Sequence, residues 1–161
     1  MRAEDQRRLA RLGVVASVQP IHAASDRSTA EACWADRLAD AYPWRGLAEA
    51  GALLACGSDA PIESVNPWLG IFAAVHRRHV TDRRGDWLAR QSLGAAAALS
   101  GYTTGPARGV GADNEGHLAP GAVADLACLD VDLATLLAAD ERLAEARSEL
   151  TLVGGRIVHG G

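Results

Sequence analysis

The sequence predicts an α/β fold with a parallel sheet, followed by a small β layer. Two short apolar runs, Val14–Gln19 and Ala52–Cys56, alternate with helix-like segments, which is typical of βα units. Glycines become frequent after about Thr104, and short apolar runs then follow one another closely. With 161 residues the chain can form one good core. It is too short for a complete eight-stranded α/β barrel, which needs about 250 residues.

The first two elements are a helix and a strand. Ala3–Leu12 is rich in Arg, Leu and Glu, and Gly13 ends it as a C-terminal glycine does. The run Val14–Gln19 then predicts a short buried strand, which Pro20 stops. Ile21–Ser28 is expected to be a loop.

Helical segments flank the second strand. We expect a helix over Thr29–Asp40, with Ser28 or Thr29 as its N-cap. A short helix over Trp44–Ala50 precedes the strand Ala52–Cys56.

Two more helices follow a polar loop. Pro67–His76 has Asn66 as its predicted N-cap and its proline at the first helical position. Trp87–Ser100 is predicted to be one longer helix that ends at Gly101.

The last third of the chain predicts a small β layer, distinct from the α/β part. Ala124–Leu129, Leu150–Val153 and Arg156–His159 read as its strands. Gly154-Gly155 between the last two is a hairpin signal, and Leu133–Arg147 is expected to be partly helical.

Composition and charge argue against a nucleic-acid partner. Hydrophobic residues make up 48% of the chain, charged residues 22%, and the net charge is -4. The densest positive cluster consists of Arg77, Arg78, His79, Arg83 and Arg84. We interpret it as a solvated loop after a helix, because no basic stripe extends from it.

Membrane and secretory signals are absent from the sequence pattern. No apolar run approaches about 18 residues, and the charged N-terminus has no apolar region behind it. Cys33, Cys56 and Cys128 are odd in number and widely spaced. They predict reduced, mostly buried thiols in a cytoplasmic protein.

Asp59 is the strongest candidate for chemistry. It follows the end of an apolar strand, where we expect it to be buried and able to bind a metal or take a proton from water. The alternative is a carboxylate that caps the next turn through Ser58 and Ala60. His22 lies just past the other strand and either contacts substrate or only bonds a neighbouring loop. Glu63 is expected to face solvent.

Other motifs carry little chemistry. His76 and His79 have a spacing that could hold a metal, but nearby arginines would repel the cation. His117 and His159 are expected on the surface. The sequence contains no GxSxG, no P-loop and no GxGxxG after a strand.

Three segments stand out: Leu12–Ala23; Ala41–Leu47, leading to Gly51 and Gly57–Pro61; and Gly116–Leu126, with Leu129-Asp130 and Val153–Val158 after it. Together they resemble the C-terminal part of a metal-dependent amidohydrolase. The branch that includes N-substituted formamide deformylases is the most similar one. In this family a (β/α)₈ TIM barrel is joined to a small β-sandwich.

The resemblance implies a fold and roles for two residues. Residues 1–106 would be C-terminal βα units of the TIM barrel, about strands seven and eight, and residues 107–161 the β-sandwich portion. Asp59 would bind the metal and shuttle a proton, and His22 would lie near the substrate. The cofactor would be a divalent metal, zinc in the usual case, and the substrate a small amide or formamide.

The remaining metal ligands of the family do not occur in the sequence. The family's HxH pair lies on the first barrel strand, and no HxH exists in this chain. Because a catalytic zinc usually has three protein ligands, we expect the isolated chain to be inactive. It would be the C-terminal portion of a metal-dependent hydrolase of C–N bonds, and the alternatives are a truncated non-enzymatic remnant or one half of a split enzyme that needs a complementing chain. As a partner, a second copy of the same chain in a homo-oligomer is the alternative to a complementing chain.

Overall fold

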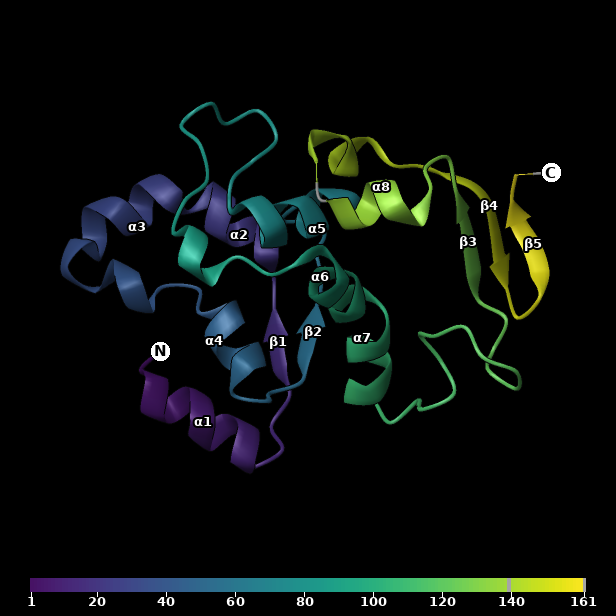
Figure 1. Ribbon diagram of the computed structural model, residues 1–161, viewed down its shortest axis with the longest axis horizontal. Coiled ribbons are helices and arrows are strands. Elements are labelled where there is room, and N and C mark those ends of the chain that lie inside the picture. Colours follow the sequence, from purple (N-terminus) through teal and green to yellow (C-terminus); the bar gives the residue numbers. More distant parts are fainter. Residues whose placement is uncertain (139, 161) are drawn as a thin grey trace.

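A two-stranded parallel sheet lies among helices, and a separate three-stranded sheet lies at the far end of the molecule (Figure 1). The computed structural model describes residues 1–138 and 140–160. In the parallel sheet β1 (Ala16–Val18) pairs with β2 (Leu54–Cys56), and Ala16 lies opposite Leu54. Both strands are shorter than predicted, but their positions and the parallel pairing confirm the predicted α/β class.

Helix α1 (Ala3–Arg11) confirms the first prediction, and Gly13 after it has the positive φ of 66° that favours glycine. The predicted loop over Ile21–Ser28 is wrong. Helix α2 (Pro20–Ser25) occupies it instead, because Pro20 stands at the first helical position and Ile21 packs against α5.

The long helix predicted over Thr29–Asp40 is also divided. It consists of α3 (Arg27–Cys33) and the 3₁₀ helix η1 (Ala35–Asp40), which meet at Trp34. Neither Ser28 nor Thr29 is the N-cap, because α3 begins earlier, directly after Asp26.

Helices α4 (Trp44–Glu49) and α5 (Pro67–His76) match the prediction closely. The Asn66 side chain accepts a hydrogen bond from the Trp68 backbone N–H at 3.0 Å, as an N-cap does. Helix α5 is buried along most of its length, and Phe72 on it is only 1% exposed.

The single helix predicted over Trp87–Ser100 is wrong. A 3₁₀ turn η2 (Ala89–Gln91) is followed by α6 (Ala95–Tyr102) and α7 (Thr104–Gly109). Gly94 is extended and interrupts the helical path. Gly101 does not end a helix but lies buried inside α6, where it allows close approach to Cys56.

Gly105 on α7 packs directly on the backbone of β2, which yields a testable expectation. A Cβ at this position would overlap the Leu54 carbonyl oxygen, which cannot rotate away. Gly105→Ala is therefore expected to lower the free energy of unfolding by about 1–3 kcal/mol, measured by urea denaturation. Gly109→Ala on the same helix is the matched control, since its Cβ would meet Val15 at an ordinary 3.5 Å. Equal stability of the two variants would contradict this packing.

The C-terminal sheet confirms the predicted small β layer. Strand β4 (Ser148–Val153) pairs antiparallel with β3 (Leu126–Leu129) and with β5 (Arg156–His159). Gly154 and Gly155, with φ of 55° and 77°, form the predicted hairpin turn. Between β3 and β4 lie α8 (Leu133–Ala138) and the 3₁₀ helix η3 (Glu141–Glu145).

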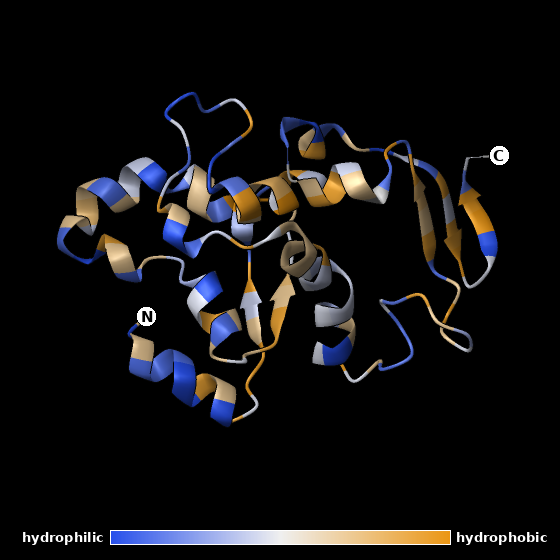
Figure 2. Ribbon diagram, in the orientation of Figure 1, coloured by the Kyte–Doolittle hydropathy of each residue, from blue (hydrophilic) through white to orange (hydrophobic). Residues whose placement is uncertain are grey.

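One hydrophobic cluster joins the two regions. Leu136 on α8 and Leu143 on η3 are 5% and 1% exposed and belong to the same cluster as Phe72 and Trp44. Figure 2 shows hydrophobic residues along α5 and in both sheets. The division after residue 106 falls within α7 and stays a prediction. Within the described residues no helix is long and apolar enough to cross a bilayer.

Candidate functional site

Asp59 lies in the loop after β2, beyond the carboxyl end of the strand. Its backbone is left-handed, with φ of 59°, a conformation that Asp adopts more readily than most residues. Its carbonyl oxygen accepts a hydrogen bond from the Ile62 N–H at 2.9 Å. The side chain is 54% exposed, so the predicted burial is wrong. The reason is that Gly57 and Ser58 carry the chain clear of the strand before Asp59.

His22 on α2 faces Asp59 across the carboxyl ends of the two parallel strands. Its Nε2 lies 3.7 Å from the Asp59 Oδ2, which is too long for a hydrogen bond. This nitrogen is buried and has no hydrogen-bond partner among the described residues. A buried polar atom without a partner is unfavourable, so a ligand that bonds to Nε2 would stabilise the site.

A second contact joins the same two segments. The Ser25 hydroxyl on α2 donates a hydrogen bond to the Glu63 carboxylate at 2.5 Å. Glu63 is thus half-buried rather than fully solvated. The contacts of Asp59 and Glu63 with α2 together fix the β2–α5 loop against the helix that carries His22.

His22 and Asp59 carry two donor types that occur in metal sites. An imidazole nitrogen and a carboxylate are both ligands that zinc accepts. No group of three or more His, Cys, Asp or Glu residues is placed to hold a metal within residues 1–138 and 140–160. The donors therefore fit a metal only in part, and a metal bound here would need further ligands.

The predicted solvated arginine loop is wrong for its first two residues. Arg77 is fully buried and Arg78 is 9% exposed. The Arg77 guanidinium donates hydrogen bonds to the carbonyl oxygens of Trp87 and Tyr42 at 3.0 and 2.9 Å. The central carbon of the guanidinium, Cζ, lies 4.5 Å from the centre of the Trp44 ring. These contacts replace the hydration that a loop arginine would keep.

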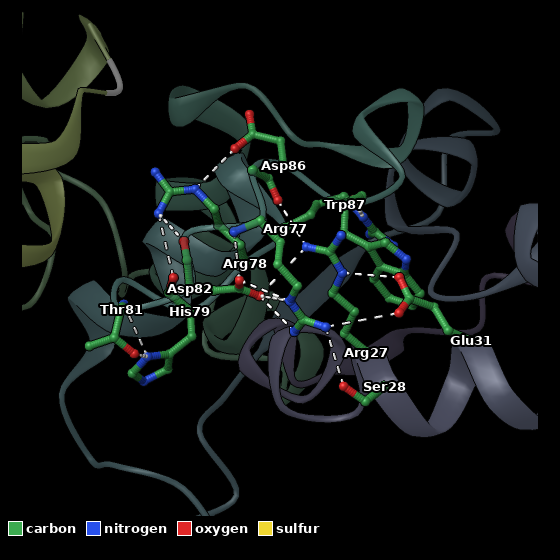
Figure 3. A network of polar contacts seen from close by, with 12 residues as sticks. Arg27, Ser28, Glu31, Arg77, Arg78, His79, Thr81, Asp82, Asp86 and Trp87 are labelled. Atoms are coloured by element: carbon green, nitrogen blue, oxygen red, sulfur yellow. Dashed lines mark hydrogen bonds and ion pairs between the residues drawn. The ribbon is translucent and has the colours of Figure 1, made fainter.

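The rest of that loop forms the ion network of Figure 3. Asp82 pairs with Arg84 at 2.8 Å and with Arg27 on α3 at 3.5 Å. Hydrogen bonds from Arg84 lower the pKa of Asp82 to about 2. The network attaches the loop after α5 to α3, which is a structural role.

Among the residues that the structure describes, the other histidines do not form a second metal-binding cluster. His76 lies 3.8 Å from Asp86, while His79 contacts Thr81, and these two histidines share no ligand set with each other. His117 and His159 are exposed, as predicted. Their imidazoles remain separate from the His22 and Asp59 pair.

Only one cysteine follows the prediction of buried thiols. Cys56 is buried, and burial raises the pKa of its thiol to about 12, which makes it unreactive. Cys33 and Cys128 are exposed, because Cys33 ends α3 and Cys128 lies on the open sheet. All three thiols are free.

A cavity of about 490 Å³ adjoins His22, and the sequence reasoning missed it. Three aromatic side chains, Trp34, Tyr42 and Trp44, line it. The chain has only four Trp, two Tyr and one Phe. The concentration of aromatic residues between positions 34 and 44 was the signal that could have indicated a binding wall.

The fold that brings His22 and Asp59 to the carboxyl ends of the parallel strands is similar to parts of solved structures. One similar structure is an uncharacterized metal-dependent hydrolase from Pyrococcus horikoshii, with a TM-score of 0.65 and 34% identity. The match covers 75% of this chain and 25% of that one.

The chain belongs to the amidohydrolase family, whose model matches residues 1–159. The Bacillus subtilis protein named "Putative amidohydrolase YtcJ" is 34% identical over 155 residues. The Arabidopsis thaliana protein LONG AFTER FAR-RED 3 is 34% identical over 130 residues. These matches cover 94% and 78% of this chain.

The chain is much shorter than these relatives. It spans 29% of YtcJ and 22% of LONG AFTER FAR-RED 3. A structure of N-isopropylammelide isopropylaminohydrolase from Burkholderia multivorans has a TM-score of 0.61 at 22% identity, which shows similarity of fold only. The resemblance to metal-dependent amidohydrolases is thereby confirmed at the level of the family.

Proposed function

We propose that this chain is the C-terminal portion of a divalent-metal hydrolase that cleaves C–N bonds of small amides, such as N-substituted formamides. The observation that carries the proposal is the juxtaposition of His22 and Asp59 at the carboxyl ends of adjacent parallel strands. Ligands of barrel enzymes bind at that end of the strands. In this proposal β1 and β2 are strands seven and eight of a (β/α)₈ barrel.

Asp59 is proposed as a metal ligand and as the group that accepts a proton from the attacking water. The oxygen of that water adds to the amide carbon, and Asp59 then passes the proton to the departing amine nitrogen as the C–N bond breaks. Its exposed carboxylate can reach water and substrate. A bound zinc ion would supply polarisation of the scissile carbonyl.

His22 is proposed to contact the substrate. Its buried Nε2 has no hydrogen-bond partner among the described residues, so it can bond a polar atom of a ligand. The same nitrogen could instead ligate a metal. A change in KM rather than in metal content on His22→Gln would favour the substrate role.

The remaining ligands are proposed to come from a segment that holds the other barrel strands, on another polypeptide or on a longer form of this one. The support for this is that two donors come together among the described residues, whereas a catalytic zinc usually has three protein ligands. A remnant without activity is the alternative.

Metal content and turnover test this proposal. The isolated chain is expected to hold far less than one zinc per molecule by elemental analysis and to hydrolyse no N-substituted formamide. Co-expression with a segment of a relative that carries strands one to six is expected to give a complex with stoichiometric metal and turnover. Stoichiometric metal in the isolated chain would contradict the incomplete site. A metal-loaded complex that hydrolyses no amide would contradict the proposed reaction.

A further inference from the structure

Apolar packing holds helix α2 against α5 but does not by itself fix where His22 points. Ile21 and Ala24 share one side of α2, and both are buried against α5. Such contacts have no preferred direction, so they oppose rotation of the helix only weakly. Ser25 bonds Glu63 in the β2–α5 loop, but no residue of that loop is buried. A directional contact with a firmly held residue is still needed.

Asp26 makes that contact one turn beyond His22. It directly follows α2, and its backbone N–H donates a hydrogen bond to the His22 carbonyl oxygen at 2.7 Å. Residues four apart share a face of a helix, so the Asp26 and His22 side chains lie on the same side of α2. The Asp26 carboxylate accepts a hydrogen bond from the Tyr42 hydroxyl at 2.9 Å. Tyr42 and His22 also line the same cavity, which agrees with this orientation.

Tyr42 is held by contacts with other elements and is therefore a fixed reference for α2. Its backbone is left-handed, with φ of 50°, which is unfavourable for a bulky side chain. The Arg77 guanidinium donates a hydrogen bond to its carbonyl oxygen at 2.9 Å. The ring centroids of Trp44 and Trp87 each lie 6.0 Å from the centroid of the Tyr42 ring. Both the backbone and the ring of Tyr42 are thus restrained.

The Tyr42 hydroxyl keeps its proton at neutral pH and can act as the donor. Burial, followed by the hydrogen bond to Asp26 and the negative charge of Asp26, raises the pKa of Tyr42 to about 12. The positive charge of Arg77 acts in the opposite direction and is the smallest of these effects. A hydrogen bond from a neutral hydroxyl to a carboxylate is stronger than one between two neutral groups.

We propose that the Tyr42–Asp26 hydrogen bond positions His22, because it fixes the rotation of α2 at which the His22 Nε2 lies 3.7 Å from the Asp59 carboxylate. Tyr42 and Asp26 act through the helix and are positioning residues. The orientation of His22 stands on this geometry alone, whereas its consequence for hydrolysis rests on the proposed function. A rotation of α2 at Asp26 turns His22 with it, since both side chains belong to the same face.

Imidazole NMR signals of the metal-free chain test the positioning directly. Tyr42→Phe and Asp26→Ala each remove the bond, so each is expected to shift the His22 signals. The signals of the other histidines are expected to stay in place and serve as internal references, namely those of His76, His79, His117 and His159. Both variants are expected to fold, because Ile21 and Ala24 remain packed on α5, and circular dichroism checks this.

Three further variants separate the hydrogen bond from other effects. Asp26→Asn is expected to keep the His22 signals near their wild-type positions, because the asparagine oxygen can still accept a bond from the Tyr42 hydroxyl. The double variant Tyr42→Phe/Asp26→Ala is expected to shift them no further than either single change, since both changes remove the same bond. Asp36→Ala is the control, because it removes an exposed carboxylate on η1 and should move no histidine signal.

Turnover of the complemented enzyme separates this proposal from the proposed function. Tyr42→Phe and Asp26→Ala are each expected to lower kcat/KM by about 10–100-fold, the size of effect that a misplaced contact produces. Unchanged His22 signals in both variants, additive shifts in the double variant, or equal shifts in Asp26→Asn and Asp26→Ala would each overturn the positioning. Shifted His22 signals with unchanged kcat/KM would support the positioning and contradict only the role of His22 in the proposed function.

Discussion

Arg77→Ala is expected to lower the free energy of unfolding by about 3–5 kcal/mol. Arg77 has no exposed surface. Its guanidinium donates hydrogen bonds to the backbone carbonyl oxygens of Trp87, Tyr42 and Ala41. Alanine would leave the buried carbonyls without donors and create a cavity beside Trp44. This loss is a large part of the total stability of a small domain.

The planar shape of the Arg77 guanidinium, and not its charge alone, explains the expected loss of stability. Within the described residues no carboxylate pairs with Arg77, so its planar group is stabilised by carbonyl oxygens and by the rings of Trp44 and Trp87. A lysine cannot span these acceptors or stack in the same way. Arg77→Lys is therefore expected to lose about half as much stability as the alanine variant.

Urea denaturation measures these differences. Arg90→Ala is the control, because Arg90 is exposed and should change stability by less than about 0.5 kcal/mol. If Arg77→Ala lowered the free energy of unfolding as little as Arg90→Ala, the buried guanidinium would not stabilise the packing around Trp44 and Tyr42.

Asp59→Asn is expected to lower the turnover of the complemented enzyme by about 10²–10⁴-fold. Asparagine tolerates the left-handed backbone at this position, so the loop should keep its shape. The amide cannot accept the proton of the attacking water and is a weaker metal ligand than a carboxylate.

The expected pattern separates catalysis from folding. Asp59→Asn should show reduced turnover and metal content with unchanged thermal stability. Asp113→Asn is the control, because Asp113 is an exposed loop carboxylate far along the chain from this loop. Retention of full turnover by Asp59→Asn would remove Asp59 from the proposed mechanism.

Capping and turn residues correctly predicted the elements that are stabilised by contacts between neighbouring residues. The Asn66 cap and Pro67 define the start of α5, and the Gly154-Gly155 turn defines the last hairpin, because each uses hydrogen bonds between near neighbours. The parallel strands could be predicted because short apolar runs that alternate with helices usually form a parallel sheet.

Long-range packing explains the failures. Helix α2 carries the polar residues His22 and Ser25, and it forms because Ile21 packs on α5 and Ser25 bonds Glu63 far along the chain. The break before α6 depends on the extended Gly94, which an alanine-rich pattern conceals.

The candidate site was predictable only in part. Family resemblance predicted a metal-binding Asp59 and a His22 near the substrate, and in the structure the two side chains lie 3.7 Å apart. The exposure of Asp59 and the aromatic cavity were missed, because they depend on the path of the β2–α5 loop and on Arg77 behind Trp44. No spacing in the sequence encodes those contacts.

Leu136 and Leu143 limit how this protein can be recombined with its relatives. Both come from the last third of the chain, yet they complete the cluster that contains Phe72 on α5. A chimera that exchanged only the three-stranded sheet and its connecting helices would replace part of the inner packing of its host. The C-terminal region is thus not an interchangeable module, and viable exchanges between homologues would have to carry matched side chains on α5 with it.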